Sequence, residues 1–209
     1  PDTVYAIIDE SAKFATDVLD PLNWSGDQEG AKHHGVDNSV TTPKGFKAAY
    51  DGYCGMGGAA LPMPAEFGGL GMPRSLITLT DEIVHSSNMS FGLLPMLTQG
   101  AIEAILLAGS DSLKQMYLPK MVSGEWTGTM NLTEPQAGSD LALVKTRAEQ
   151  QADGTFKIFG TKIFITFGEH DFTSNIIHLV LARLPDAPEG VKGISLFVVP
   201  KFNINADGS

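Results

Sequence analysis

Apolar residues recur at helical spacing through most of the first half of the chain. A stripe that runs from Val4 to Leu19 predicts an amphipathic helix over residues 3–20, which should end at Pro21. Ser110 is placed to cap one later helix, and Gly109 to end the helix before it. The same spacing predicts a short helix from about residue 44 and helices over residues 74–87, 99–108 and 110–119.

Two segments between these helices lack a regular pattern. Residues 23–43 are polar and rich in glycine, which predicts an extended or looping connection. Residues 61–73 contain three prolines and three glycines, too many breakers for a helix or strand, and are predicted to form an ordered loop or a lid.

After Gly124 the pattern changes to short β-rich runs separated by turn residues. Asp153 and Gly154 form a good hairpin turn, and residues 184–190 form a loop. We therefore predict an α+β protein, with an all-helical domain over residues 1–124 and an antiparallel, barrel-like β domain over residues 125–209. The predicted strands are residues 126–132, 144–151, 155–159, 161–166, 176–183 and 194–199.

Composition narrows the possible partners. The chain has 209 residues, 43% of them hydrophobic, so it is long enough for one large domain or two small ones. Its formal net charge is −10 without a basic cluster, which argues against nucleic acid. The single cysteine, Cys54, excludes an internal disulfide and fits a cytoplasmic protein. No leader and no run near the roughly 20 apolar residues of a membrane span is evident, whereas the start at Pro1 suggests a fragment.

The segment from Met130 to Asp140 is the strongest candidate for a binding site. A strand with alternating polarity ends at Thr133, and Pro135 and Gly138 then favour a sharp turn with exposed N–H groups beside two hydroxyls. Such a turn can hold an anion or the polar edge of a ring. The same residues also suit an ordinary surface loop between two strands.

This segment, with the sequence Met-Asn-Leu-Thr-Glu-Pro-Gln-Ala-Gly-Ser-Asp, resembles the signature of the acyl-CoA dehydrogenase family, and residues 160–166 resemble that family's second flavin-contacting strand. The resemblance covers nearly the whole chain and implies FAD as cofactor, with substrate entering between the β domain and the helices. It also implies that a C-terminal four-helix bundle is absent from this chain. The residues that it places against the flavin ring are Met130, Leu132, Thr133, Phe164 and Thr166, and it places Ser139 where FAD and acyl-CoA approach each other.

Many family members have tryptophan at the position of Phe164, so here the aromatic face is kept and the indole N–H is lost. The resemblance implies oxidation of an acyl-CoA to a trans-2-enoyl-CoA, with electron-transfer flavoprotein as acceptor and a homo-oligomeric full-length protein. The family's base is a glutamate in the bundle, so no catalytic residue is assigned to this chain. Glu134 is expected to be structural, and Glu66 and Glu125 to be surface carboxylates.

Three alternatives remain open at this point. The reaction fits a dehydrogenase or an acyl-CoA oxidase on the same scaffold, and the chain also fits a non-catalytic binding or assembly module. The segment from Gly168 to Lys201 resembles the larger family members, which include enzymes that act on 3-methylthiopropanoyl-CoA.

A group of residues in the helical half either shapes the acyl site or belongs to the core. These residues are Met89, Phe91, Leu94, Met96 and Leu97.

Two histidine-containing segments have the composition of a metal site but not its spacing. Residues 168–171 are consecutive in a loop and rarely converge on one ion, and His33 and His34 have no partner at helical spacing. No metal is therefore predicted.

Overall fold

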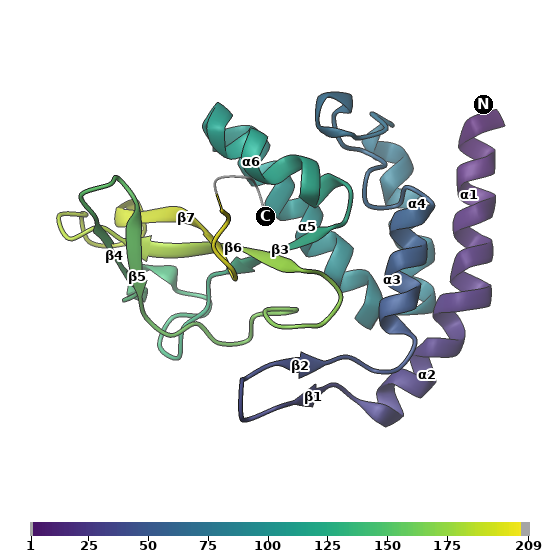
Figure 1. Cartoon of the computed structure of the whole chain (residues 1–209), viewed down its shortest axis with the longest axis horizontal. Coiled ribbons are helices and arrows are strands. Elements are labelled where there is room, and N and C mark those ends of the chain that lie inside the picture. Colours follow the sequence, from purple (N-terminus) through teal and green to yellow (C-terminus); the bar gives the residue numbers. More distant parts are fainter. Residues whose placement is uncertain (1, 206–209) are drawn as a thin grey trace.

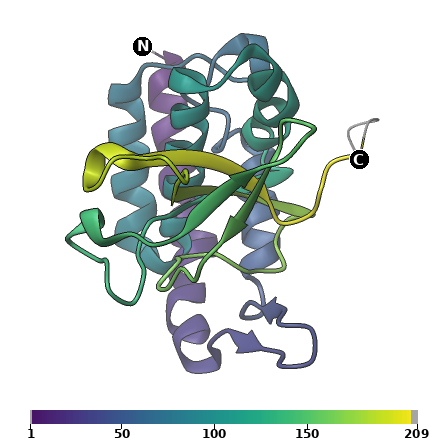
Figure 2. The same cartoon turned by 90° about the vertical axis from the view of Figure 1, so that its left-hand side faces the viewer.

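Helices and a sheet occupy opposite sides of the molecule. The computed structural model describes residues 2–205. In Figure 1 most of the helices stand together on the right and the larger sheet extends to the left, and in Figure 2 the sheet crosses in front of the helices. The helices are α1 (Asp2–Phe14), α2 (Asp20–Glu29), α3 (Phe46–Gly55), α4 (Arg74–Ser87), α5 (Met89–Ala108) and α6 (Asp111–Val122).

The larger sheet is built around β6. The strands are β3 (Trp126–Asn131), β4 (Arg147–Gln150), β5 (Phe156–Phe159), β6 (Asn175–Arg183) and β7 (Ile194–Pro200). β3 and β7 both pair with residues 177–180 of β6, so they lie along its opposite edges. β4 follows β3 along the same edge and carries β5. A separate hairpin, β1 (Lys32–His33) with β2 (Val40–Thr41), extends beneath the larger sheet in Figure 1.

The predicted α+β class is confirmed: a helical region is followed by a sheet. The antiparallel pairing that was expected is found for β4 with β5 and for β6 with β7, whereas β3 and β4 both run parallel to β6. In the chain, β3 and β6 are separated by the β4–β5 hairpin. This long connection allows the chain to cross over, so that β6 pairs with β3 and runs in the same direction. The domain boundary at residue 124 stays a prediction.

The first predicted helix does not end at Pro21. A π-helical turn, Ala15–Leu19, joins α1 to α2, and the chain stays helical to Glu29. Pro21 lies in the first turn of α2, where its missing N–H and fixed φ are tolerated. Residues 23–29, predicted to loop, are therefore helical.

The other helical predictions are largely confirmed. α4 matches residues 74–87, α6 begins after the Ser110 cap, and residues 61–73 contain only turns and a short 3-10 helix, Ala65–Phe67. α5 is longer than predicted, since it begins at Met89, where the side chain of Asn88 accepts from the Phe91 N–H.

α5 is the central helix of the fold. It is the one helix within residues 2–205 that is long and apolar enough to cross a membrane, which the sequence analysis did not anticipate. Half of its most apolar stretch is buried inside the fold, as expected of a core helix. α5 packs against α4, α6 and β3, and its residues Ala101, Ile102 and Ile105 share a core with strand residues such as Ile177.

The contact between α5 and β3 requires a glycine. A Cβ at Gly128 would lie 2.5 Å from the Ala101 Cβ and 2.8 Å from the Met121 Cε. The Gly128 N–H donates to the buried Thr98 hydroxyl at 3.1 Å. The strand can therefore approach the helix closely while this backbone donor stays paired.

Replacing Gly128 should separate the helix from the sheet. We expect Gly128→Val to lower the free energy of unfolding by roughly 1–3 kcal/mol, the usual cost of overpacking a dense core. Equilibrium urea denaturation measures the change. Gly35→Ala is the control, since nothing lies within 4 Å of a Cβ at Gly35. Equal stability of the two variants would contradict this account of the junction.

Candidate functional site

The signature segment begins where β3 ends. β3 finishes at Asn131, and Glu134 and Ala137 then form an isolated bridge in which each N–H donates to the other's carbonyl, at 2.9 and 3.0 Å. This bridge closes a tight turn around Pro135 and Gln136. The predicted turn is therefore present, and it is fixed by its own backbone.

The second candidate segment lies directly beside the first. The Ile163 N–H donates to the Thr133 carbonyl at 2.9 Å, and the Lys162 ammonium donates to the Leu132 carbonyl at 3.0 Å. The structure thus brings together the two segments that the sequence matched to the family's flavin-contacting strands.

Residues 161–166 do not form the predicted strand. Residues 161–165 have no regular structure and a turn follows, because Gly160, Phe164 and Phe167 have φ values of 159°, 57° and 52°. Positive φ at Phe164 and Phe167 is unusual for bulky residues and breaks the pleat of a strand. Apolar alternation in the sequence could not reveal these backbone turns.

A buried ion pair joins the two segments. The Lys162 ammonium lies 2.8 Å from the Glu134 carboxylate, and the side chains are only 9% and 3% exposed. The carboxylate also accepts from the N–H groups of Lys145 and Thr146, at 2.8 and 3.0 Å, and from the Gln136 amide. We call these five residues the Glu134 clasp. The expectation that Glu134 is structural fits its complete set of donors.

The clasp keeps Glu134 ionised. Burial by itself would raise the pKa of the carboxyl, but the hydrogen bonds from Lys162, Thr146 and the neighbouring backbone outweigh burial and lower the pKa to about 2. A carboxylate with so low a pKa is a poor proton acceptor at neutral pH. Glu134 is therefore unsuited to act as a general base.

The predicted flavin-contacting residues differ in exposure. Met130, Leu132 and Thr133 are half-buried at the end of β3, whereas Thr166 and Ser139 are exposed. Phe164 is 88% exposed, and its backbone is in the left-handed region. The residue before Phe164 is hydrogen-bonded to the Thr133 carbonyl, so this exposed aromatic residue lies near a hydroxyl-bearing residue, which suits a flat ring with a polar edge. The roles of these residues in binding stay predictions.

Two residues that organise the site were not singled out from the sequence. Lys162 lies between two apolar pairs, Ile158-Phe159 and Ile163-Phe164, and a lysine that is buried in such a setting needs a partner. Arg183, at the end of β6, donates to the carbonyls of Val144, Ala142 and Pro188 at 2.7, 2.7 and 3.2 Å. It holds the 3-10 turn Leu141–Leu143 that follows the signature segment.

The side chains of the histidine-containing loop at residues 168–171 contact different parts of the structure. The Lys201 ammonium donates to Glu169 at 2.6 Å, Asp171 accepts from the Thr42 hydroxyl at 2.6 Å, and the buried His170 contacts Thr127 at 2.9 Å. Within residues 2–205, no three His, Cys, Asp or Glu residues form a group that could hold a metal. These side chains connect the loop to β3 and to the residues that directly follow β2 and β7.

The residues offered as acyl-site candidates divide into two groups. Phe91 and Leu94 are fully buried in the core, so they support α5 instead of lining an open site. Met89 is 61% exposed, Met96 is exposed and Leu97 is half-buried. Only the second group is placed to contact another molecule or segment.

Comparisons with known proteins agree with this fold. The family model for the acyl-CoA dehydrogenase N-terminal domain matches residues 6–125, and the model for the middle domain matches residues 129–207. The chain belongs to the acyl-CoA dehydrogenase family.

Two curated relatives and one solved structure give the scale of the similarity. The chain is 54% identical to a 3-methylmercaptopropionyl-CoA dehydrogenase of Ruegeria pomeroyi, over 96% of this chain and 34% of the relative. It is 43% identical to a butyryl-CoA dehydrogenase of Syntrophomonas wolfei, over 100% of this chain and 34% of the relative. A glutaryl-CoA dehydrogenase structure from Mycobacterium smegmatis matches with a TM-score of 0.76 and 25% identity, over 96% and 46% of the two chains. The chain thus spans about a third of these curated relatives.

His170 should make stability depend on pH. Burial, together with the positive charge of Lys201, lowers its pKa from 6.5 to about 4, and its Nδ1 accepts from the Phe172 N–H. Because the folded-state pKa is the lower one, its contribution is complete above pH 6.5 and is lost as pH falls toward 4. Unfolding free energies measured across this range should fall less steeply for His170→Gln than for the unmodified protein. Equal slopes would contradict the assignment.

Proposed function

We propose that the full-length protein is an FAD-dependent acyl-CoA dehydrogenase that converts an acyl-CoA to a trans-2-enoyl-CoA. The observation that carries the proposal is the juxtaposition of residues 130–134 with residues 162–166, joined by the bond from the Ile163 N–H to the Thr133 carbonyl. Family membership over both domains supports the same reaction.

When bound, FAD supplies the oxidising chemistry by accepting a hydride from the substrate. The chain's own residues bind and orient the ring. Met130, Leu132 and Phe164 offer apolar surface, and the hydroxyls of Thr133 and Thr166 offer neutral donors to its polar edge. Ser139 is proposed to lie between cofactor and substrate. Its neighbour Gly138 lies close to Thr133, since a Cβ at Gly138 would be 3.9 Å from the Thr133 side chain.

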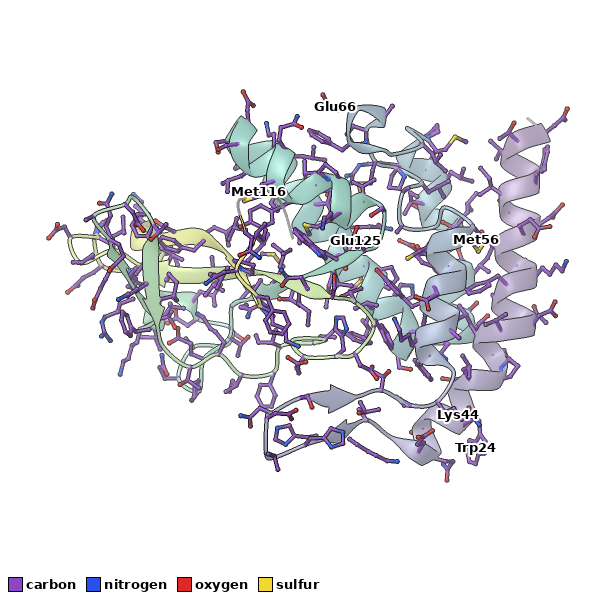
Figure 3. The ribbon with its side chains drawn as sticks, in the orientation of Figure 1. Trp24, Lys44, Met56, Glu66, Met116 and Glu125 are labelled. Carbon is purple, nitrogen blue, oxygen red and sulfur yellow. The ribbon has the colours of Figure 1, made fainter. Side chains whose placement is uncertain are left out.

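The base is proposed to come from another part of the full-length protein. Glu134 is held ionised by the clasp, Glu125 pairs with Lys120 at 3.0 Å, and Glu66 is exposed on the turn at the top of Figure 3. None of these three carboxylates is both buried and unpaired, which is the setting of a general base in a closed active site.

The substrate is proposed to be a short acyl-CoA. The names of the two relatives specify 3-methylmercaptopropionyl and butyryl groups, both short chains. Exposed Met89 and Met96 on α5 are soft, adaptable side chains that suit such a group.

We further propose that the full-length protein is a cytoplasmic homo-oligomer that passes its electrons to electron-transfer flavoprotein. Rapid peroxide formation in an oxygen-consumption assay would contradict this acceptor and would favour an acyl-CoA oxidase instead.

The proposed function predicts a coloured protein. Full-length protein purified under native conditions should show flavin absorption in the visible range and should reduce an artificial dye when a short acyl-CoA is added. A protein that is colourless and gains no flavin absorption with added FAD would contradict the proposal and favour a non-catalytic module.

Phe164 should contribute to FAD affinity through its ring. We expect Phe164→Ala in the full-length protein to weaken FAD binding by roughly five- to tenfold, since an aromatic contact is worth on the order of 1 kcal/mol. Phe164→Trp should bind FAD at least as well as the unmodified protein. Trp24→Ala is a matched control, because Trp24 is 73% exposed on α2, at the lower right of Figure 3. Fluorescence titration with FAD distinguishes these outcomes, and equal affinities for Phe164→Ala and Trp24→Ala would contradict a ring contact.

A further inference from the structure

We propose that Lys162 and Glu134 are positioning residues that set the spacing between the two flavin-contacting segments. The inference rests on the proposed function, because it concerns how the FAD site is held in shape. Neither residue is proposed to touch the substrate or to transfer a proton.

The first argument is that regular structure does not fix this spacing. β3 has ended at Asn131, and residues 161–165 form no strand, so no ladder of backbone bonds registers one segment against the other. The bond from the Ile163 N–H to the Thr133 carbonyl gives one point of attachment. A single attachment leaves the two segments free to pivot.

Lys162 supplies a second attachment nearby. Its ammonium donates to the Leu132 carbonyl at 3.0 Å and to the Glu134 carboxylate at 2.8 Å. Lys162 therefore binds the first segment on both sides of Thr133. Together with the Ile163 bond, these contacts hold the Thr133 backbone relative to Phe164 and Thr166.

Glu134 extends this hold to a third segment. Its carboxylate accepts from the N–H groups of Lys145 and Thr146, which lead into β4. The two segments are thus fixed to the sheet as well as to each other. A change at Glu134 should be transmitted to the Leu132 and Thr133 positions.

The burial of the pair also favours a positioning role. Taking two charges out of water costs about as much as their attraction returns, so a buried ion pair is weak evidence for stability. Two apolar side chains of similar volume would fill the same space but would not fix the orientation of one segment relative to the other. What the charged pair adds is a fixed direction and distance at the end of β3, where the family's flavin-contacting residues lie.

The test uses the full-length holoprotein and three variants. Lys162→Met removes the ammonium and keeps the length of the side chain. Lys162→Met combined with Glu134→Gln removes both charges. Lys201→Met is the matched control, because it breaks the pair with Glu169 at 2.6 Å, whose side chains are 27% and 28% exposed and which lies outside the clasp. FAD affinity, the visible flavin spectrum and the melting temperature are measured for each.

We expect both Lys162 variants to bind FAD roughly tenfold or more weakly and to shift the flavin absorption bands, as misplaced supporting contacts usually do. Lys201→Met should keep the unmodified affinity and spectrum even if its melting temperature falls. A spectral shift in a folded protein is a readout that loss of stability alone does not produce.

Three results overturn the inference. The first is unmodified FAD affinity and spectrum in Lys162→Met. The second applies if Lys162→Met does not fold: it is normal FAD binding by the double variant. The third is failure of the double variant to fold, because the pair would then serve stability instead of position. By contrast, absence of FAD binding by the unmodified full-length protein would refute the proposed function itself.

Discussion

The buried contact between Lys162 and Glu134 is the interaction on which the candidate site depends. Two charges that are almost fully withdrawn from water must be satisfied completely, and the Glu134 clasp does so with donors from three separate segments. The requirement to satisfy one carboxylate therefore brings the end of β3, the start of β4 and the segment before Phe164 to one place.

A second constraint places this site on a rigid support. β3 ends at the signature segment, and Gly128 lets the strand lie directly against α5, whose residues Ala101, Ile102 and Ile105 are in the core. Thr98 pairs with the strand backbone, so the contact is polar as well as close. The site thus extends from a strand whose position is set by a dense core, and the clasp fixes only the last few residues.

The sequence predicted the parts of this arrangement that follow from periodicity. α4, α6 and most strands were recognised because their apolar faces are regular, and the two flavin-matching segments were recognised from their motifs. Pro21 was misread because a proline in the first turn of a new helix looks the same as a proline after an old one. The strand expected at residues 161–166 failed because positive φ at Phe164 leaves no trace in hydrophobic alternation. Apart from Gln136, the partners of Glu134 come from residues that are 11–28 positions away, so their convergence is a property of the tertiary structure.

The central claim is that residues 130–139 and 160–167 together form the FAD-binding site of this chain. Amide hydrogen exchange of the full-length protein, with its FAD removed and then restored, tests that claim most directly. The account predicts that restoring FAD slows exchange in both segments, including the N–H groups at Thr133 and Phe164, and leaves the β1–β2 hairpin unchanged. Protection confined to other parts of the protein, or to only one of the two segments, would contradict it.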